Sequence, residues 1–313
     1  QKKLDDINKL LNEYLRNKKI EFVTFFNKVN KTSDKKLDVE FRFVKKSRRY
    51  VNLINISGNT ITEEKVIRRN LLFSEGDSYL DYKVSKSIDK VKSLKIFKDV
   101  KFQTENSGNE KVDLNIYVEE QPTGSVSAGI GVGSSGSTIS STIVEKNLFG
   151  KGIMLDGNAS FGTEKVSGNV GLSLPDFMNT GNTFNYNIFA INTDFENSGY
   201  ESKKIGNGFS TQYNVYEDIS LRTGFGIDLD AINTNDSASS LYKSREGDYL
   251  TYEGFYSISN DKRNSKFQPS KGYRVGFGQG LALPGSDITY IENNLDAAIY
   301  HSMSDNYIFS LKS

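Results

Sequence analysis

Residues 124–133, GSVSAGIGVG, decide how the second half of this chain is interpreted. Apolar and small polar residues alternate here with a period of two, which is the side-chain period of a β-strand. The apolar positions are Val126, Ala128, Ile130 and Val132, and the intervening positions are Ser127, Gly129, Gly131 and Gly133. The pattern predicts a strand that is apolar on one face and almost bare on the other.

The same alternation recurs about eleven times up to Ser313, for example in 153–161, 166–174, 209–215, 219–230 and 273–278. A soluble sandwich would turn the apolar rows inward, whereas a membrane barrel turns them toward lipid. Strands of nine to eleven residues, polar loops and aromatic residues near the strand ends favour the membrane barrel. These aromatic residues are Tyr186, Tyr213, Tyr249, Tyr273 and Tyr290.

Composition excludes several classes of function. The 313 residues carry 40 Lys plus Arg and 39 Asp plus Glu, so the net charge of +1 gives no reason to expect a nucleic-acid partner. There is no cysteine and a single histidine, His301. No nucleophile motif, phosphate loop or metal-ligand spacing is present, and Asp296 and His301 should point to opposite faces of one strand. We therefore expect no enzymatic activity, no cofactor and no metal.

Residues 1–120 have a different pattern, rich in Lys, Asp and Glu. Helical spacing over 4–18 and strand-like runs at 20–29 and 36–46 predict helix, strand, strand for residues 1–47. Residues 48–121 predict β-α-α-β-β, with Thr62 as the N-cap of the first helix and the second helix over 81–95. This order predicts a small α+β domain.

Three runs in this domain are the landmarks of a known family: INISGNTITEEKVIRRNLLFSEGD (54–77), SIDKVKSLKIFKDVKF (87–102) and VDLNIYVEEQPTG (112–124). They resemble the last polypeptide-transport-associated (POTRA) repeat of the BamA family of outer-membrane protein assembly factors. The resemblance implies that 48–121 is the last POTRA repeat and that 1–47 is the C-terminal part of the preceding one. It also implies a periplasmic location for both.

The rest of the chain is similar to the barrel of the same family in GSVSAGIGVGSSG (124–136), EKNLFGKG (145–152), LSLPDFMNTGNTF (172–184) and DKRNSKFQPSKGYR (261–274). The resemblance implies that residues 122–313 are the N-terminal portion of an antiparallel transmembrane β-barrel. About eleven of the family's sixteen strands would be present, and the chain would be a segment of a longer precursor.

The resemblance implies a function: insertion and folding of β-barrel proteins in the outer membrane. The alternative is a polypeptide secretion or translocation pore of the same superfamily, TamA-like or a two-partner secretion transporter. A passive porin would explain the barrel but not the POTRA-like repeats. The expected partners are unfolded barrel clients, accessory lipoproteins and outer-membrane lipid.

The candidate site for client binding is the first barrel strand. Each glycine weakens a strand by about 0.5–1 kcal/mol, so a seam rich in glycine can open and offer its edge to a client strand. The predicted gate comprises Ser125, Val126, Ser127, Ala128, Gly129, Ile130, Gly131, Val132 and Gly133. The alternative is that these glycines merely allow the strand to bend.

Two smaller sets complete the predicted sites. Arg68, Arg69 and Asn70 would dock a partner lipoprotein, although the family often has an acidic residue where this chain has Asn70, and a solvated helix face is the alternative. Asp261, Arg263, Pro269 and Gly272 would form a structural turn that fixes strand register.

Overall fold

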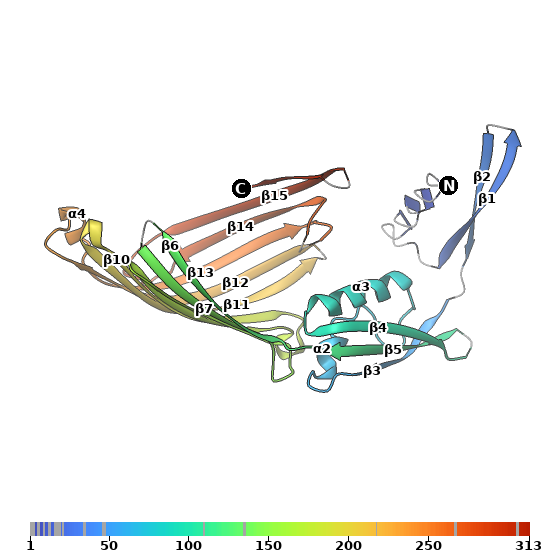
Figure 1. Ribbon diagram of the computed structural model, residues 1–313, viewed down its shortest axis with the longest axis horizontal. Helices are drawn as coiled ribbons and strands as arrows, with labels where there is room; N and C mark the ends of the chain where they lie inside the picture. Colours follow the sequence, from blue (N-terminus) through green and yellow to red (C-terminus); the bar gives the residue numbers. More distant parts are fainter. Residues whose placement is uncertain are drawn as a thin grey trace. The chain divides into compact units, whose positions relative to one another are not determined.

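The computed structural model describes the whole chain except residues 1–3, 5–6, 9, 12–13, 16–19, 21, 34–35, 46–47, 109, 134–135, 217, 266–267 and 305–306. The chain divides into two compact units, residues 1–121 and residues 122–313. Each unit is drawn in Figure 1. No helix in the described part of the chain is long and apolar enough to cross a membrane.

The first segment of unit 1 contains a two-stranded antiparallel sheet. Strand β1 (Val23–Ser33) pairs with β2 (Lys36–Lys45), in agreement with the two predicted strands. Part of the predicted helix over 4–18 lies outside the described residues, and its described residues, such as Leu4 and Leu11, are helical. The assignment of 1–47 to a separate repeat stays a prediction.

The rest of unit 1 is a three-stranded sheet with two helices. In chain order its elements are β3 (Tyr50–Ser57), α2 (Glu64–Arg68), α3 (Asp81–Ser93), β4 (Phe97–Asn106) and β5 (Lys111–Glu120). The strand order in space is β3-β5-β4, with β3 and β5 parallel and β4 and β5 antiparallel. This β-α-α-β-β order confirms the predicted fold of the repeat.

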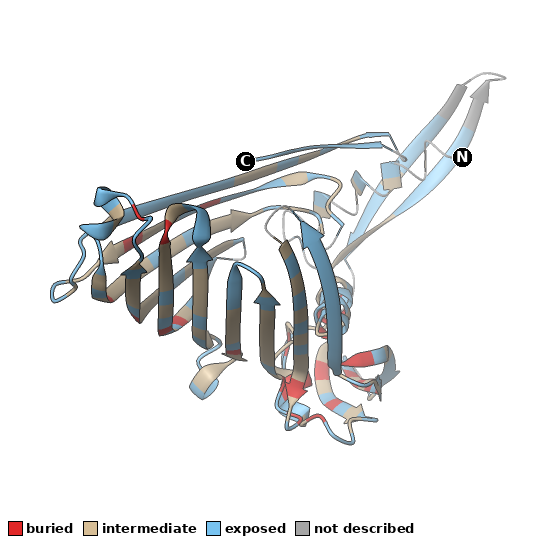
Figure 2. Ribbon diagram, turned by 60° about the vertical axis from the view of Figure 1, so that its left-hand side comes forward, coloured by how far each residue is buried: buried red, intermediate tan, exposed pale blue. Residues whose placement is uncertain are grey.

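A continuous apolar core holds this sheet to its helices. Alternate residues of the central strand β5 are buried because their side chains all point to the face that the helices cover. The core comprises Val51, Ile54, Val66, Ile67, Phe73, Val84, Val91, Ile96, Phe97, Val100, Leu114, Ile116 and Val118. In Figure 2 the buried segments of α2, α3 and the three strands are coloured red.

The carboxylate of Glu120 fixes the loop before α2. It accepts hydrogen bonds from the backbone N–H groups of Thr60 (3.1 Å), Ile61 (3.0 Å) and Thr62 (2.7 Å), and from the Thr60 hydroxyl (2.7 Å). The prediction that Thr62 caps α2 is wrong. The N-cap is Glu63, without a side-chain cap, and the Thr62 hydroxyl hydrogen-bonds the Glu120 carboxylate at the end of β5 instead of capping the helix.

Protonation of Glu120 is expected to destabilise this loop. Burial favours the neutral carboxyl, but the hydrogen bonds from Thr60, Ile61 and Thr62 outweigh it and lower the pKa of Glu120 from 4.5 to about 2. Since the folded pKa lies below the unfolded one, the contribution to stability is complete above pH 4.5 and is lost as the pH falls toward 2. After allowance for solvent screening we expect about 1–2 kcal/mol.

Hydrogen exchange of the Thr60, Ile61 and Thr62 amides measures this effect. Glu120→Gln should increase their exchange at pH 7 and remove the pH dependence of this loop between pH 5 and 3. Glu119→Gln is the matched control, because the Glu119 carboxylate pairs with the exposed Lys98 and not with the amides of this loop. Equal protection of the three amides in both variants would contradict the role of Glu120.

Unit 2 is one antiparallel sheet of eleven strands within the described residues, ordered β16-β15-β14-β13-β12-β11-β10-β9-β8-β7-β6. This number matches the prediction. The sheet is open, so it is an incomplete barrel with β6 and β16 at its edges (Figure 1). Its strands are β6 (Gly124–Gly133), β7 (Gly136–Leu148), β8 (Ile153–Gly162), β9 (Lys165–Leu174), β10 (Thr183–Phe195), β11 (Tyr200–Tyr216), β12 (Ile219–Thr234), β13 (Gly247–Asp261), β14 (Gly272–Ala282), β15 (Ile291–Ser304) and β16 (Tyr307–Lys312). A short helix α4 (Ser240–Lys243) lies between β12 and β13.

The strand register gathers the apolar rows on one face of this sheet. Directly opposed pairs continue from strand to strand, as in Ile130↔Ile139 and Ile139↔Phe161. We call the side that carries these residues the apolar face and the opposite side the polar face. Following the register, the apolar face includes Val132, Leu155, Val170, Ile188, Ile205, Phe209, Leu221, Phe225, Ile227, Ile258, Val275, Phe277, Leu295 and Ile299.

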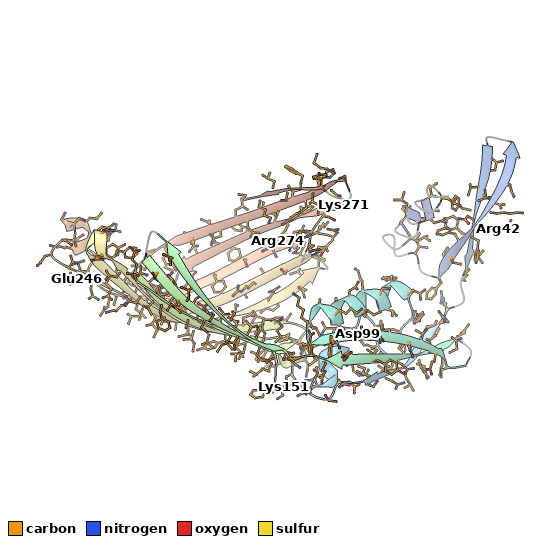
Figure 3. The ribbon with its side chains drawn as sticks, viewed as in Figure 1. Arg42, Asp99, Lys151, Glu246, Lys271 and Arg274 are labelled. Carbon is orange, nitrogen blue, oxygen red and sulfur yellow. The ribbon has the colours of Figure 1, made fainter. Side chains whose placement is uncertain are left out.

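The polar face is the crowded inner side of the curved sheet. Ser210 and Thr251 are only 2% exposed and Asp228 is 8% exposed, and all three lie on this face. A groove of about 450 Å³ on the same face is lined by charged and polar side chains of β12–β15, including Arg222, Glu253, Arg274, Glu292 and Asp296. Figure 3 labels Arg274 on β14. The apolar residues therefore occupy the outer side.

Candidate functional site: the edge strand and the outer face

Strand β6 is an exposed edge. It pairs with β7 and with no other strand in the described part of the chain, and all ten of its residues are exposed. The apolar side chains of Val126, Ile130 and Val132 are 74%, 81% and 84% exposed. In this sheet of eleven strands the second edge of β6 has no neighbour, so the backbone N–H and C=O groups of every second residue lack a ladder partner there.

The inner side of β6 is as bare as the sequence predicts. A Cβ added at Gly131 or Gly133 would meet no atom within 4 Å, and one at Gly129 would reach only the Ser140 hydroxyl at 3.4 Å. Steric crowding therefore does not require glycine at these three positions. None of the three has a positive φ, so backbone conformation does not require glycine either.

A hydrogen bond to Glu145 on β7 holds the residue that precedes β6. The Glu145 carboxylate accepts hydrogen bonds from the Thr123 hydroxyl and from the Asn147 backbone N–H. Asn147 is buried, and its Oδ1 accepts a bond of 2.7 Å from the Gly152 N–H. Sequence reasoning missed Glu145 and Asn147. The signal was available in EKNLFGKG, where two polar side chains precede a turn with two glycines.

The outer face carries a row of aromatic rings across four strands. Phe184, Phe209, Phe225 and Tyr252 follow one another with ring centroids 6.4, 5.6 and 6.5 Å apart. Phe177, in the turn before β10, stacks on Phe184 at 4.9 Å. A large exposed apolar surface of this kind indicates contact with a partner or a membrane.

The four residues predicted as a turn motif lie where β13 meets β14: Asp261 ends β13, Gly272 begins β14, and Arg263 and Pro269 lie in the turn between them. Arg263 binds the Asp261 carboxylate with two hydrogen bonds of 2.8 and 2.7 Å. Gly272 has φ +100°, and a Cβ there would lie 2.1 Å from the Lys262 carbonyl oxygen. Sequence reasoning missed Asn264, whose Oδ1 accepts bonds from the Ser270 and Lys271 N–H groups at 3.0 Å.

We expect Gly272→Ala to disrupt this turn. The positive φ costs about 1–3 kcal/mol for a residue with a side chain, and the clash with the Lys262 carbonyl adds to it. The yield of folded barrel, measured by its shift in electrophoretic mobility on heating, should fall several-fold. Gly181→Ala is the matched control: Gly181 also has a positive φ in a turn at the same end of the sheet, but its Cβ meets nothing within 4 Å. Equal loss in both variants would show that the clash is unimportant.

The predicted docking residues of unit 1 are partly engaged within the unit. Arg68 donates to Glu64 (2.5 Å), to Glu75 (2.8 Å) and to the carbonyl oxygen of Ile54 (2.8 Å). These hydrogen bonds to Glu75 and Glu64 raise the pKa of Arg68. The side-chain amide of Asn70 donates to the carbonyl oxygen of Val66. Arg69 follows α2 and is half-buried. Docking by these residues stays a prediction.

The fold, with the apolar outer face and the polar inner face of the large sheet, defines the class of protein. It is an α+β repeat of the POTRA type followed by part of an outer-membrane β-barrel. Residues 49–121 match the POTRA family described as a surface antigen variable number repeat, and residues 147–313 match the Omp85 superfamily domain. The second match covers more than half of the chain. The chain belongs to the Omp85 superfamily, and its location is the outer membrane.

Individual relatives agree with this assignment. The chain is 27% identical over 287 residues to the outer membrane protein assembly factor BamA of Neorickettsia risticii, and 24% identical over 307 residues to that of Nitratidesulfovibrio vulgaris. The alignments cover 91% and 96% of this chain but 39% of each relative, so the chain spans about two fifths of their length. The crystal structure of BamA from Haemophilus ducreyi lacking POTRA domains 1–3 superposes with a TM-score of 0.70 at 21% identity, covering all of this chain and 63% of that one.

These assignments carry no information on catalysis. Among the residues that the structure describes, no group of three or more His, Asp or Glu side chains is placed to hold a metal ion. Asp296 and His301 point to opposite faces of β15, as predicted, because they are five positions apart along the strand. The absence of enzymatic activity and of a cofactor stays a prediction.

Proposed function

We propose that the protein of which this chain forms a part inserts and folds β-barrel proteins in the outer membrane. The observation that carries the proposal is the inner side of β6, the first strand of the barrel sheet: it has three glycines, Gly129, Gly131 and Gly133, that neither steric crowding nor backbone conformation requires. The names of the relatives support the same activity, because several of them are outer membrane protein assembly factors.

In the proposed mechanism, β6 is the movable side of a lateral gate. The strand that closes the barrel on β6 would separate from it, and a client strand would add to the freed edge by β-augmentation. Backbone hydrogen bonds supply the binding, so clients of many sequences can be accepted. The apolar side chains of Val126, Ile130 and Val132 would keep the new strand at the lipid boundary.

Glycine supports this role through strand stability. Gly129, Gly131 and Gly133 offer no side chains for contacts with the closing strand. Ordering three glycines in a strand also costs more backbone entropy than ordering other residues, so the pairing of β6 with the closing strand is weak. The bonds at Glu145 tie the start of β6 to β7, on the edge away from the seam. They would keep β6 in its sheet while the closing strand separates from it.

Unit 1 would receive clients and accessory lipoproteins in the periplasm. Its sheet has two edges, β3 and β4, because β5 is central. Strand addition at either edge is a second route for client contact. Arg68 and Arg69 are candidates for lipoprotein docking. Docking through Arg68 would require its hydrogen bonds to Glu64 and Glu75 to break.

Depletion of the full-length protein in its own cells tests the proposed function. We expect the amounts of many different outer-membrane barrel proteins to fall together, while periplasmic proteins are unchanged. Accumulation of one exported polypeptide in the periplasm, with barrel proteins at normal levels, would instead support the secretion pore. Steady passage of small solutes through reconstituted vesicles would support a porin.

A further inference from the structure

The outer face of the barrel sheet has a shallow apolar groove near the strand ends opposite the linker to unit 1. Its floor is a row of small residues that oppose one another across three strands, Ala159, Gly168 and Ala190. Its walls include Phe161, Val166 and Ile205, and its volume is about 350 Å³. The groove is open to the surroundings of the barrel, because Phe161 and Ile205 are 61% and 57% exposed.

Polar and charged groups follow the groove in a fixed order toward the strand ends. Asn192 and Lys203 form the next opposed pair after Ala190 and Ile205, and Asp194 and Glu201 form the pair after that. Successive pairs on one face are about 6.8 Å apart along a strand. Moving outward, a lipid would therefore meet an apolar groove, then an ammonium group, then two carboxylates.

The polar groups at the end of the groove nearest the strand ends can make further hydrogen bonds to a ligand. Lys203 Nζ lies 3.0 Å from a carboxylate oxygen of Glu201, and the Asn192 amide donates to the other oxygen of Glu201 at 2.9 Å. Asn192 Oδ1 is buried without a hydrogen-bond partner among the described residues. Among the described residues the Lys203 ammonium pairs with the Glu201 carboxylate, and Asp194 lies opposite Glu201 on the neighbouring strand.

We propose that this groove binds a phospholipid with a phosphoethanolamine headgroup. One acyl chain lies over Ala159, Gly168 and Ala190, the phosphate pairs with Lys203, and the ammonium group donates to Asp194 and Glu201. The charge order fits a zwitterion whose phosphate is nearer the acyl chains than its ammonium. The proposal requires only that the barrel lies in the outer membrane, and it is independent of the assembly activity.

Headgroup selectivity is the first test. Full-length protein in detergent is mixed with equal amounts of phosphatidylethanolamine, phosphatidylcholine and phosphatidylglycerol, and bound lipid is counted by native mass spectrometry. We expect preferential retention of one phosphatidylethanolamine, because choline has no N–H to donate and glycerol has no positive charge. Equal retention of all three lipids would overturn the headgroup assignment.

Variants locate the binding. Gly168→Leu should reduce retention about five- to tenfold, since its side chain fills the groove. A Cβ at Gly168 meets only the Asn158 carbonyl oxygen at 3.7 Å, so the fold tolerates it. Gly157→Leu is the matched control, on the same face and equally open (3.9 Å) but outside the groove. Lys203→Gln should also reduce retention, and Lys203→Arg should restore it. Unchanged retention in folded Gly168→Leu would overturn the groove as the site.

Discussion

Ile227→Lys is expected to lower the free energy of unfolding of the membrane-embedded barrel by about 2–4 kcal/mol. Ile227 lies near the middle of the 16-residue strand β12, on the apolar face between Asn207 and Tyr252. A lysine there must either desolvate its charge in hydrocarbon or distort the sheet to reach water. Unfolding of the full-length protein in lipid vesicles, followed by its electrophoretic mobility shift, measures the change.

The neighbouring position supplies the control. Gly226 is on the polar face, and a Cβ there is 3.5 Å from the Asn207 carbonyl oxygen, which is ordinary contact. Gly226→Lys places the same charge on the inner side, and we expect a loss of at most about 1 kcal/mol. A larger loss from Gly226→Lys than from Ile227→Lys would mean that lipid does not contact the apolar face.

Replacing the three inner glycines of β6 by valine is expected to slow client assembly about ten- to a hundredfold. Each Gly→Val change on this strand should stabilise pairing by about 0.5–1 kcal/mol, so opening the seam should cost about 1.5–3 kcal/mol more in the triple variant. Because Cβ atoms at Gly129, Gly131 and Gly133 have room, the barrel itself should fold normally. Folding of a purified barrel client into vesicles that contain the full-length protein gives the rate.

Gly226→Val is the control for this experiment, because it adds the same side chain to the inner side of a central strand. It should leave the rate of client folding unchanged. A triple variant that folds and still assembles clients at the normal rate would contradict the gate mechanism. It would favour the alternative that the glycines merely let β6 bend.

The sequence predicted the sheet well because strand faces follow from local alternation. The row Val132, Leu155, Leu221 and Val275 could be assigned to one face before any register was known, and the structure places all four there. The β-α-α-β-β order of residues 48–121 was equally accessible, because helix and strand periods differ.

Contacts between distant residues could not be predicted in this way. Glu120 binds the amides of Thr60–Thr62 across about sixty residues, and nothing in the local sequence of either segment indicates the pairing. The error at Thr62 has the same origin, because a threonine before an acidic helix start is a favourable N-cap until another group binds its hydroxyl, as Glu120 does here. Glu145 and Asn147 were missed because their role depends on the fold of the turn around them.

The central claim is that lipid covers the apolar face of the barrel sheet, and single tryptophans test it most directly. The chain contains no tryptophan, so Phe255→Trp and Tyr256→Trp introduce one probe each at adjacent positions of β13 that face opposite sides. In the full-length protein, in vesicles of lipids brominated on the acyl chains, the tryptophan at 256 should be strongly quenched and the one at 255 only weakly. Stronger quenching at 255 would contradict the account.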